Sequence, residues 1–338
     1  MFQKKTDKNL KYSIIITACF VLVSAGIYFT KNLNYSRDVI LQKANSYYIN
    51  EQYFMAAKYF DKAICLGASS IELYRDYGTS LLNLGNYDLA IKYFKLVINL
   101  EPNDFENYYC IGNVLYHKAY VSNSKEKFLQ AVQYLEKGIN LNPESEKIYL
   151  LIGLCFRSCS LQENARTFYR QALLVGNFSR AGFYNLIGNT FREEGKYKEA
   201  LSSYEKAIND DHLFVAAYCS VGDMYLKLDN DKAALLNYHK AIKIDKDFIN
   251  PYINIAKLYY DRNSFHEAKS WCLKALEINS NNEKANYILA MSYKAMSMKE
   301  EYVEYLKKAA ACGSDNAVYE IRNNGINEVD MSYIIRKQ

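Results

Sequence analysis

The chain has 338 residues, of which 50% are hydrophobic and 15% aromatic, and its formal net charge is +5. Residues 1–36 hold five lysines and one aspartate, a balance of +4, so only +1 of the total belongs to residues 37–338. A nucleic-acid-binding surface needs a basic stripe that displaces counterions from the phosphates. The near-neutral balance of residues 37–338 argues against that class of function, and we expect no nucleic-acid partner.

The N-terminal segment has the pattern of a membrane anchor. Residues 1–11 form a basic tail, and residues 12–29 contain no charged side chain. As a helix, residues 12–29 would span about 27 Å, close to the apolar thickness of a bilayer. We therefore predict a transmembrane helix or signal anchor over residues 12–29. The lysines before it predict a cytoplasmic N-terminus, with residues 37–338 on the periplasmic side of a bacterial inner membrane. A single-pass anchor with the remainder in the cytosol is the alternative.

Three fates of this segment compete. An uncut anchor is favoured, because apolar residues continue beyond every candidate cleavage position. The small residues at 23–25 are typical of a signal-peptidase site, and residues 16–19 resemble a bacterial lipobox ending at Cys19. The sequence alone leaves a cleaved signal peptide and a lipoprotein as alternatives.

From Arg37 onward, small residues recur with a period of 34. One series consists of Gly78, Gly112, Gly153, Gly188 and Gly222, extended by Ala44, Ala256 and Ala290. A second series consists of Ala56, Ala90, Ala131, Ala165, Ala200, Ala234 and Ala268. Antiparallel helices approach closely where both lack bulk, so paired small residues at fixed spacing predict one helical hairpin repeated along the chain. The predicted fold class is all-α.

The pattern resembles the tetratricopeptide repeat. Residues 71–104 carry Tyr74, Gly78, Leu81, Gly85, Tyr87, Ala90, Phe94 and Pro102 at the positions of its signature. Residues 181–214 carry Tyr184, Ile187, Gly188, Phe191, Gly195, Tyr197, Ala200, Tyr204 and Ala207. The resemblance implies a superhelical solenoid of about eight helical hairpins.

The repeat array is expected over residues 37–316, followed by a C-terminal capping segment and tail over 317–338. The repeats start near Arg37, Ile71, Phe105, Glu146, Ala181, Val215, Ile249 and Glu283. The third repeat is longer, and we expect its polar stretch 121–127 to lengthen the turn between the two helices. The eighth repeat has Tyr302 where alanine is expected, which is typical of a cap.

Protein binding is the function that the resemblance implies. The first helices of such repeats line a concave groove that holds extended peptide segments or partner helices. The groove-facing positions include Asn45 and Tyr48 in the first repeat, Tyr109, Asn113 and Tyr116 in the third, and Asn185, Asn189 and Arg192 in the fifth. Amides can pair with a peptide backbone and aromatic rings can hold its side chains. We predict a membrane-tethered scaffold that binds protein partners there.

An anchored import or chaperone-docking receptor with cytosolic repeats is the alternative function. The family's clamp for an acidic chaperone tail needs five particular side chains, and the fifth to seventh repeats offer Asn185, Asn189, Ser220, Lys257 and Asp261. Only Asn189 and Lys257 match, and Asp261 reverses a charge. This disfavours the receptor.

No pattern of catalytic residues is found. The sequence has no glycine-rich phosphate loop and no HExxH motif, and its four histidines fall in separate repeats. The cysteines beyond Cys19 are odd in number and stand at unrelated repeat positions, so we interpret most of them as small buried apolar residues. We expect no enzyme, no metal site and no cofactor.

Overall fold

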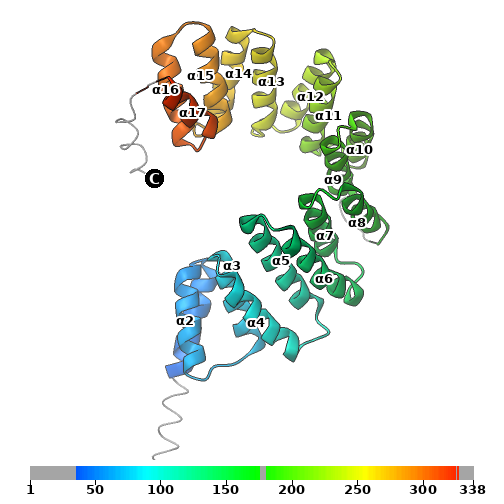
Figure 1. Cartoon of the computed structure of the whole chain (residues 1–338), viewed down its shortest axis with the longest axis vertical. Coiled ribbons are helices and arrows are strands. Elements are labelled where there is room, and N and C mark those ends of the chain that lie inside the picture. The colour runs from blue at the N-terminus through cyan, green and yellow to red at the C-terminus, as the bar shows by residue number, and fades with distance from the viewer. Residues whose placement is uncertain (1–35, 176–179, 325, 327–338) are drawn as a thin grey trace, which may run out of the picture. The chain divides into compact units, whose positions relative to one another are not determined.

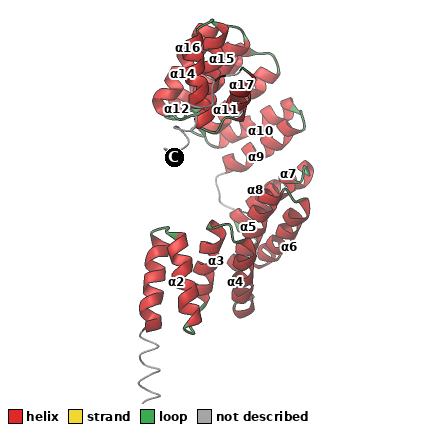
Figure 2. Ribbon diagram, turned by 60° about the vertical axis from the view of Figure 1, so that its left-hand side comes forward, coloured by secondary structure: helices red, strands yellow, loops and turns green. Residues whose placement is uncertain are grey.

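The computed structural model of the chain describes residues 36–175, 180–324 and 326, and within them every regular element is an α-helix (Figure 2). The all-α prediction is confirmed. The predicted basic tail and the predicted span over 12–29 lie outside these residues. Among the helices that are described, none is both long and apolar enough to cross a membrane.

The chain divides into two compact units, residues 1–161 and 162–338. In the N-terminal unit, helical residues 36–49 are followed by α2 (Tyr53–Cys65), α3 (Ile71–Asn83), α4 (Tyr87–Leu100), α5 (Phe105–Ser122), α6 (Lys125–Leu141) and α7 (Glu146–Ser158). The C-terminal unit contains α8 (Gln162–Val175), α9 (Arg180–Glu193), α10 (Tyr197–Asp210), α11 (Val215–Lys227), α12 (Asp231–Ile244), α13 (Asn250–Asp261), α14 (Phe265–Ile278), α15 (Glu283–Ala295), α16 (Lys299–Ala311) and α17 (Asp315–Asn323). Within each unit, consecutive helices pack as antiparallel hairpins (Figure 1).

Within each unit, the two series of small residues lie where the paired helices meet. All seven alanines of the second series have no exposed surface. In the fifth and sixth repeats, a Cβ built on Gly188 or Gly222 would fall 2.5 Å from the ring of Tyr204 or Tyr238. These glycines therefore allow a tyrosine ring of the second helix to lie directly against the backbone of the first.

One left-handed residue closes the turn inside each hairpin. Glu51, Gly85, Asn123, Ser160, Gly195, Asp229, Asn263 and Ser297 all have φ between 47° and 76°. In the second, fifth and sixth repeats this residue stands 14 positions after the start of the repeat, as with Val215 and Asp229. The same backbone conformation thus recurs with the sequence period.

The predicted long turn in the third repeat is wrong. Residues 121 and 122 end α5, residues 125–127 begin α6, and only Asn123 and Ser124 lie between the helices. Asn123 stands 18 rather than 14 positions after Phe105, so four inserted residues extend α5 and three extend α6. About one helical turn is added to each helix, which keeps both apolar faces in register. The Ser124 side chain caps α6 by accepting a hydrogen bond from the Lys127 amide at 3.4 Å.

The C-terminal cap packs against the eighth hairpin. Tyr302 is only 7% exposed and donates a hydrogen bond to Glu320 Oε2 of α17 at 3.2 Å. Ala317 and Ile321 of α17 are buried in the same apolar cluster as Tyr302. The capping segment begins with Asp315, so the predicted boundary at 316/317 falls inside α17.

Candidate functional site

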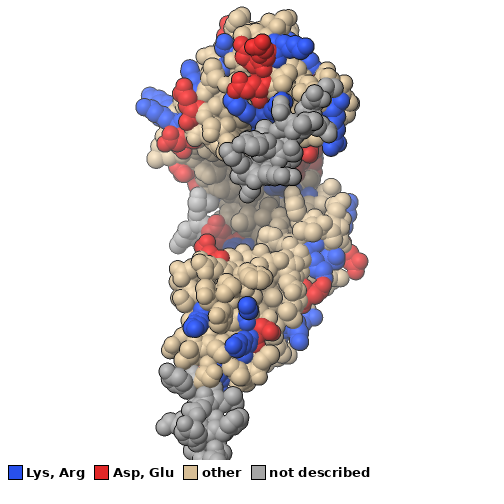
Figure 3. Space-filling model, turned by 90° about the vertical axis from the view of Figure 1, so that its left-hand side faces the viewer, with Lys and Arg blue, Asp and Glu red and all other residues tan. Residues whose placement is uncertain are grey.

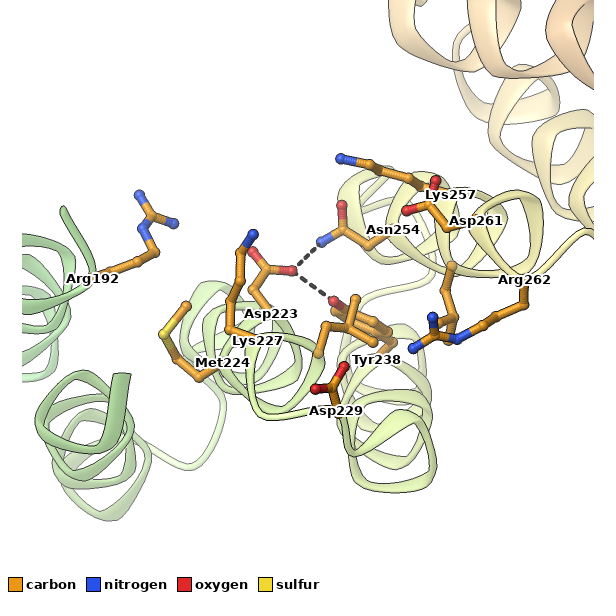
Figure 4. Close-up of a pocket in the computed structure, with 12 residues that line it drawn as sticks. Arg192, Asp223, Met224, Lys227, Asp229, Tyr238, Asn254, Lys257, Asp261 and Arg262 are labelled. Atoms are coloured by element: carbon orange, nitrogen blue, oxygen red, sulfur yellow. Dashed lines mark hydrogen bonds between the residues drawn. The ribbon is translucent and has the colours of Figure 1, made fainter. Parts of the chain in front are cut away.

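A polar pocket opens on the first helices of three consecutive hairpins in the C-terminal unit. Its volume is about 420 Å³, and α9, α11 and α13 contribute most of its lining. Arg192 comes from α9, Asp223 and Lys227 from α11, and Asn254 and Lys257 from α13 (Figure 4). Side chains far apart in the sequence meet here because each repeat places its first helix beside the next.

Asp223 is the hydrogen-bonded centre of the pocket. Its Oδ1 accepts hydrogen bonds from Tyr238 Oη at 2.6 Å and from Asn254 Nδ2 at 2.9 Å. Burial raises the pKa of Asp223, although the hydrogen bond from Tyr238 and the nearby Arg192 act in the opposite direction. The same burial raises the pKa of the Tyr238 phenol. Through its two hydrogen bonds, the Asp223 carboxylate links α11 to α12 and α13.

Two of the predicted groove residues in α9 take part in a similar hydrogen-bond network. Asn189 Oδ1 accepts a hydrogen bond from Tyr204 Oη at 2.8 Å, and Asn185 Oδ1 accepts one from Ser220 Oγ at 3.4 Å. Their side-chain oxygens thus hold neighbouring helices together. The third predicted residue of this repeat, Arg192, lines the pocket.

The other five predicted residues lie in the N-terminal unit. Asn45 is exposed and Asn113 is half-buried. The Tyr48 ring packs edge-on against Phe60, with ring centres 6.3 Å apart. Lys147 Nζ lies 4.6 Å from the centre of the Tyr109 ring.

Tyr116, the last of these five, packs edge-on against Phe128 with ring centres 5.5 Å apart. The three tyrosines are therefore partly used in packing their own unit. The described structure assigns the two sets of predicted residues to different units and does not define one site that contains both.

Sequence reasoning missed Asp223 and Lys227 as pocket residues. The period itself contains a signal for Asp223, because Asn189, Asp223 and Lys257 stand 34 residues apart on equivalent turns of α9, α11 and α13. The predicted groove residues were chosen by residue type at each position, so Asn189 was included and Asp223, at the equivalent position of the next repeat, was not. What identifies Asp223 is its contact with Tyr238 and Asn254, which only the packed helices show.

Four of the seven cysteines in the described residues fit the interpretation as apolar packing residues, whereas Cys65 is exposed and Cys110 and Cys312 are half-buried. Cys155, Cys159, Cys219 and Cys272 are buried and unpaired. Burial raises the pKa of the Cys155, Cys219 and Cys272 thiols to about 12, which keeps them protonated and unreactive at neutral pH. In the part of the chain that the structure describes, no three His, Cys, Asp or Glu residues lie together in a way that could hold a metal ion.

Comparison with protein families identifies the repeat type of several of these hairpins. A tetratricopeptide repeat model matches residues 71–104, 112–145, 215–248 and 249–282, and a second TPR repeat model matches residues 188–229. The chain contains tetratricopeptide repeats. A comparison with curated proteins gives no match.

Several solved structures are similar to this chain. A repeat protein from Parabacteroides merdae ATCC 43184 is 15% identical with a TM-score of 0.57, over 76% of this chain and 98% of that one. A chain of the APC/C hetero-tetramer Cut9-Hcn1 is 13% identical with a TM-score of 0.52, over 84% of this chain and 55% of that one. MamA protein is 24% identical with a TM-score of 0.43, over 52% of this chain and 92% of that one. At these identities, the first two of these likenesses concern the fold alone.

Proposed function

We propose that this tetratricopeptide repeat protein is a non-enzymatic scaffold, tethered to a membrane by residues 12–29, that binds peptide segments or helices of partner proteins. Repeats of this kind mediate protein–protein interactions. The observation that supports the proposal best is the pocket across α9, α11 and α13, where three repeats contribute polar side chains to one hollow. Hydrogen bonds such as that from Tyr238 to Asp223 hold side chains of the pocket lining in place, so few side chains need to become ordered when a partner binds.

Site-specific crosslinking tests the groove. We expect a photoreactive phenylalanine analogue at position 227, inside the pocket, to crosslink partner proteins in intact cells. The same analogue at position 240, an exposed residue of α12 outside the pocket lining, should crosslink at least tenfold less. Mass spectrometry of the crosslinked products is the measurement. Equal yields at the two positions would count against binding in the groove.

The proposed membrane tether over residues 12–29 can be tested separately. A C-terminal fusion to a reporter that fluoresces only in the cytoplasm should be dark, because the lysines before residue 12 favour a cytoplasmic N-terminus and an exported array. A bright, membrane-bound fusion would favour the alternative, an anchored receptor with cytosolic repeats. A bright fusion that is fully extracted by carbonate would contradict the tether itself.

A further inference from the structure

A second pocket opens between the second helices of the seventh and eighth hairpins. Its volume is about 400 Å³, and its lining includes Leu273 and Leu276 of α14, Asn286 of α15, and Tyr305 and Lys308 of α16. These three helices are consecutive neighbours in the C-terminal unit (Figure 1). None of the lining residues belongs to the pocket across α9, α11 and α13, so the two pockets are separate sites.

Asn286 carries a buried hydrogen-bond acceptor without a partner. Its Nδ2 donates to the carbonyl oxygen of Ser280 at 3.0 Å and to that of Asn282 at 2.9 Å. The residue is 1% exposed, and its Oδ1 accepts no hydrogen bond from any residue that the structure describes. Turning the amide over would set Oδ1 against two carbonyl oxygens, so the two donated bonds fix its orientation. A buried acceptor of this kind is stabilised by a donor on a ligand.

The earlier hairpins show which side chain stands at this position elsewhere in the array. One period before Asn286, the Tyr252 hydroxyl donates to the carbonyl oxygen of the residue six positions earlier, at 3.0 Å. Tyr108 and Tyr218, at the same repeat position, make the same bond at 2.9 and 3.2 Å. In the eighth hairpin Asn286 replaces the tyrosine and makes the equivalent bond to Ser280. The bond is thus kept, whereas the aromatic ring is lost.

The walls around the missing ring are otherwise the same in the seventh and eighth hairpins. In the seventh, the centre of the Tyr252 ring lies 6.0 Å from that of Trp271, and Lys274 Nζ lies 4.0 Å from the centre of the Trp271 ring. Tyr305 and Lys308 stand one period later, and Lys308 Nζ lies 4.3 Å from the centre of the Tyr305 ring. The pocket therefore corresponds to the place that the Tyr252 ring takes in the preceding hairpin.

Charge does not select the occupant of this pocket. Lys308 Nζ pairs with Glu304 at 2.6 Å, and Leu273 and Leu276 provide an apolar wall. Ser280 and Lys308 are exposed and form a polar rim. An apolar hollow with a polar rim is typical of a place that holds an aromatic side chain of a partner protein. On the face in Figure 3, basic and acidic side chains are interspersed rather than gathered in one basic stripe.

We propose that this pocket binds a tyrosine or tryptophan side chain of a partner protein, whose O–H or N–H donates a hydrogen bond to Asn286 Oδ1. The partner supplies the ring that Tyr252 supplies within the seventh hairpin. Such a side chain combines an apolar body for the walls with one polar hydrogen for the acceptor. The inference rests on the proposed function only in taking a protein as the occupant, and it adds a second binding surface outside the groove.

Methyl NMR of the full-length chain in lipid nanodiscs tests the proposal, because an aromatic ring in the pocket shifts the methyl resonances of Leu273 and Leu276. The probes are N-acetyl-tyrosinamide, N-acetyl-phenylalaninamide, which lacks the hydroxyl donor, and N-acetyl-leucinamide, which lacks the ring. We expect the tyrosine probe to bind at least about threefold more tightly than the phenylalanine probe. The leucine probe should cause no ring-current shift. Equal affinities for the first two probes, or no shift with either, would overturn the inference.

The decisive variant is Asn286→Tyr. It restores the tyrosine of the third, sixth and seventh hairpins, keeps a donor for the Ser280 carbonyl and fills the pocket. The tyrosine probe should then bind at least about tenfold more weakly, because no room is left for its ring. Urea unfolding should show no loss of stability. Lys284→Tyr adds the same side chain at an exposed position of α15 outside the lining and should leave probe binding unchanged.

Two outcomes separate this inference from its alternatives. Unchanged probe binding by Asn286→Tyr would overturn it, as would binding of free p-cresol without binding of N-acetyl-tyrosinamide, which would indicate a free small ligand. Selective crosslinking at position 227 reports on the groove and does not involve this pocket. If that crosslinking persists while the probes fail to bind, the groove function stands and only the aromatic pocket is wrong.

Discussion

Gly188→Ala is expected to lower the free energy of unfolding of the C-terminal unit by about 2 kcal/mol, because the added methyl overpacks a closed interface. The new Cβ would lie 2.5 Å from Tyr204 Cε1 and 2.6 Å from Cδ1. Tyr204 has no exposed surface, and its hydroxyl is fixed by Asn189, so the ring cannot move away without losing that hydrogen bond. The gain in helix propensity on replacing glycine, at most about 1 kcal/mol, does not offset this.

Gly182 provides the matched control within the same helix. A Cβ on Gly182 would meet no atom within 4 Å, so Gly182→Ala should raise the free energy of unfolding by about 0.5 kcal/mol. Urea unfolding followed by circular dichroism, with hydrogen exchange of α9 and α10 as the local readout, separates the two variants. Changes of the same sign and size would contradict the close approach of Tyr204.

The double variant Gly188→Ala with Tyr204→Leu tests the same contact from the other side. In the eighth repeat the equivalent pair is Ala290 and Leu306, and both are wholly buried in one cluster. Leucine leaves room for the alanine methyl, so the double variant should be more stable than the sum of the two single changes predicts. Strict additivity would show that residues 188 and 204 do not share one space.

The hairpins could be predicted because their cause is steric and local. Two helices can cross closely only where side chains are small, so Ala200 and Gly188 must recur wherever the crossing recurs, and the structure buries the whole alanine series. The Tyr302 exception was also interpretable, since a bulky residue at a crossing marks the end of the stack. It contacts Glu320 of the cap.

The third hairpin shows that the repeat pattern does not determine where inserted residues are placed. The sequence reveals extra residues between the helices but not whether they lengthen the turn or the helices. Seven residues are about two helical turns, and dividing them four and three leaves each apolar face where it was. The deciding features are Asn123 in the left-handed region and the cap formed by Ser124, and both are typical of a short connection once the longer helices are considered.

The candidate site was less predictable, because hydrogen bonds between neighbouring helices depend on side-chain geometry. A position frame places Asn189 and Asp223 on the same face but does not show that each accepts a hydrogen bond from a tyrosine of the next helix. Those bonds engage the side-chain oxygens of Asn189 and Asp223 in packing. The described contacts thus show that two polar groups on the predicted face also stabilise the array, which a position frame alone does not reveal.

Arg166 is a buried cation of the C-terminal unit whose loss should lower stability strongly. Its side chain is only 2% exposed, and its guanidinium donates to Glu194 Oε1 at 3.0 Å and to Thr190 Oγ1 at 3.3 Å. It also lies 4.4 Å from the centre of the Phe191 ring. Arg166→Ala removes a buried cation that joins α8 to α9 and leaves a cavity, so the free energy of unfolding should fall by about 3 kcal/mol.

The pH dependence of the stability lost in Arg166→Ala distinguishes the ionic contribution of Arg166 from its packing contribution. The hydrogen bond from Arg166 lowers the pKa of Glu194, so this contribution to stability is present above the ordinary glutamate pKa and is lost as the pH falls through the lowered value. Arg166→Ala should therefore cost more at pH 7 than at pH 3, as measured by urea unfolding at each pH. Arg170→Ala is the control, because Arg170 pairs at 3.2 Å with Glu163, a carboxylate that Arg166 also contacts, but is itself half-exposed, and its loss should cost under about 1 kcal/mol. Equal costs for the two variants would contradict a special contribution of the buried Arg166 guanidinium. The contact between α8 and α9 would then depend on apolar packing alone.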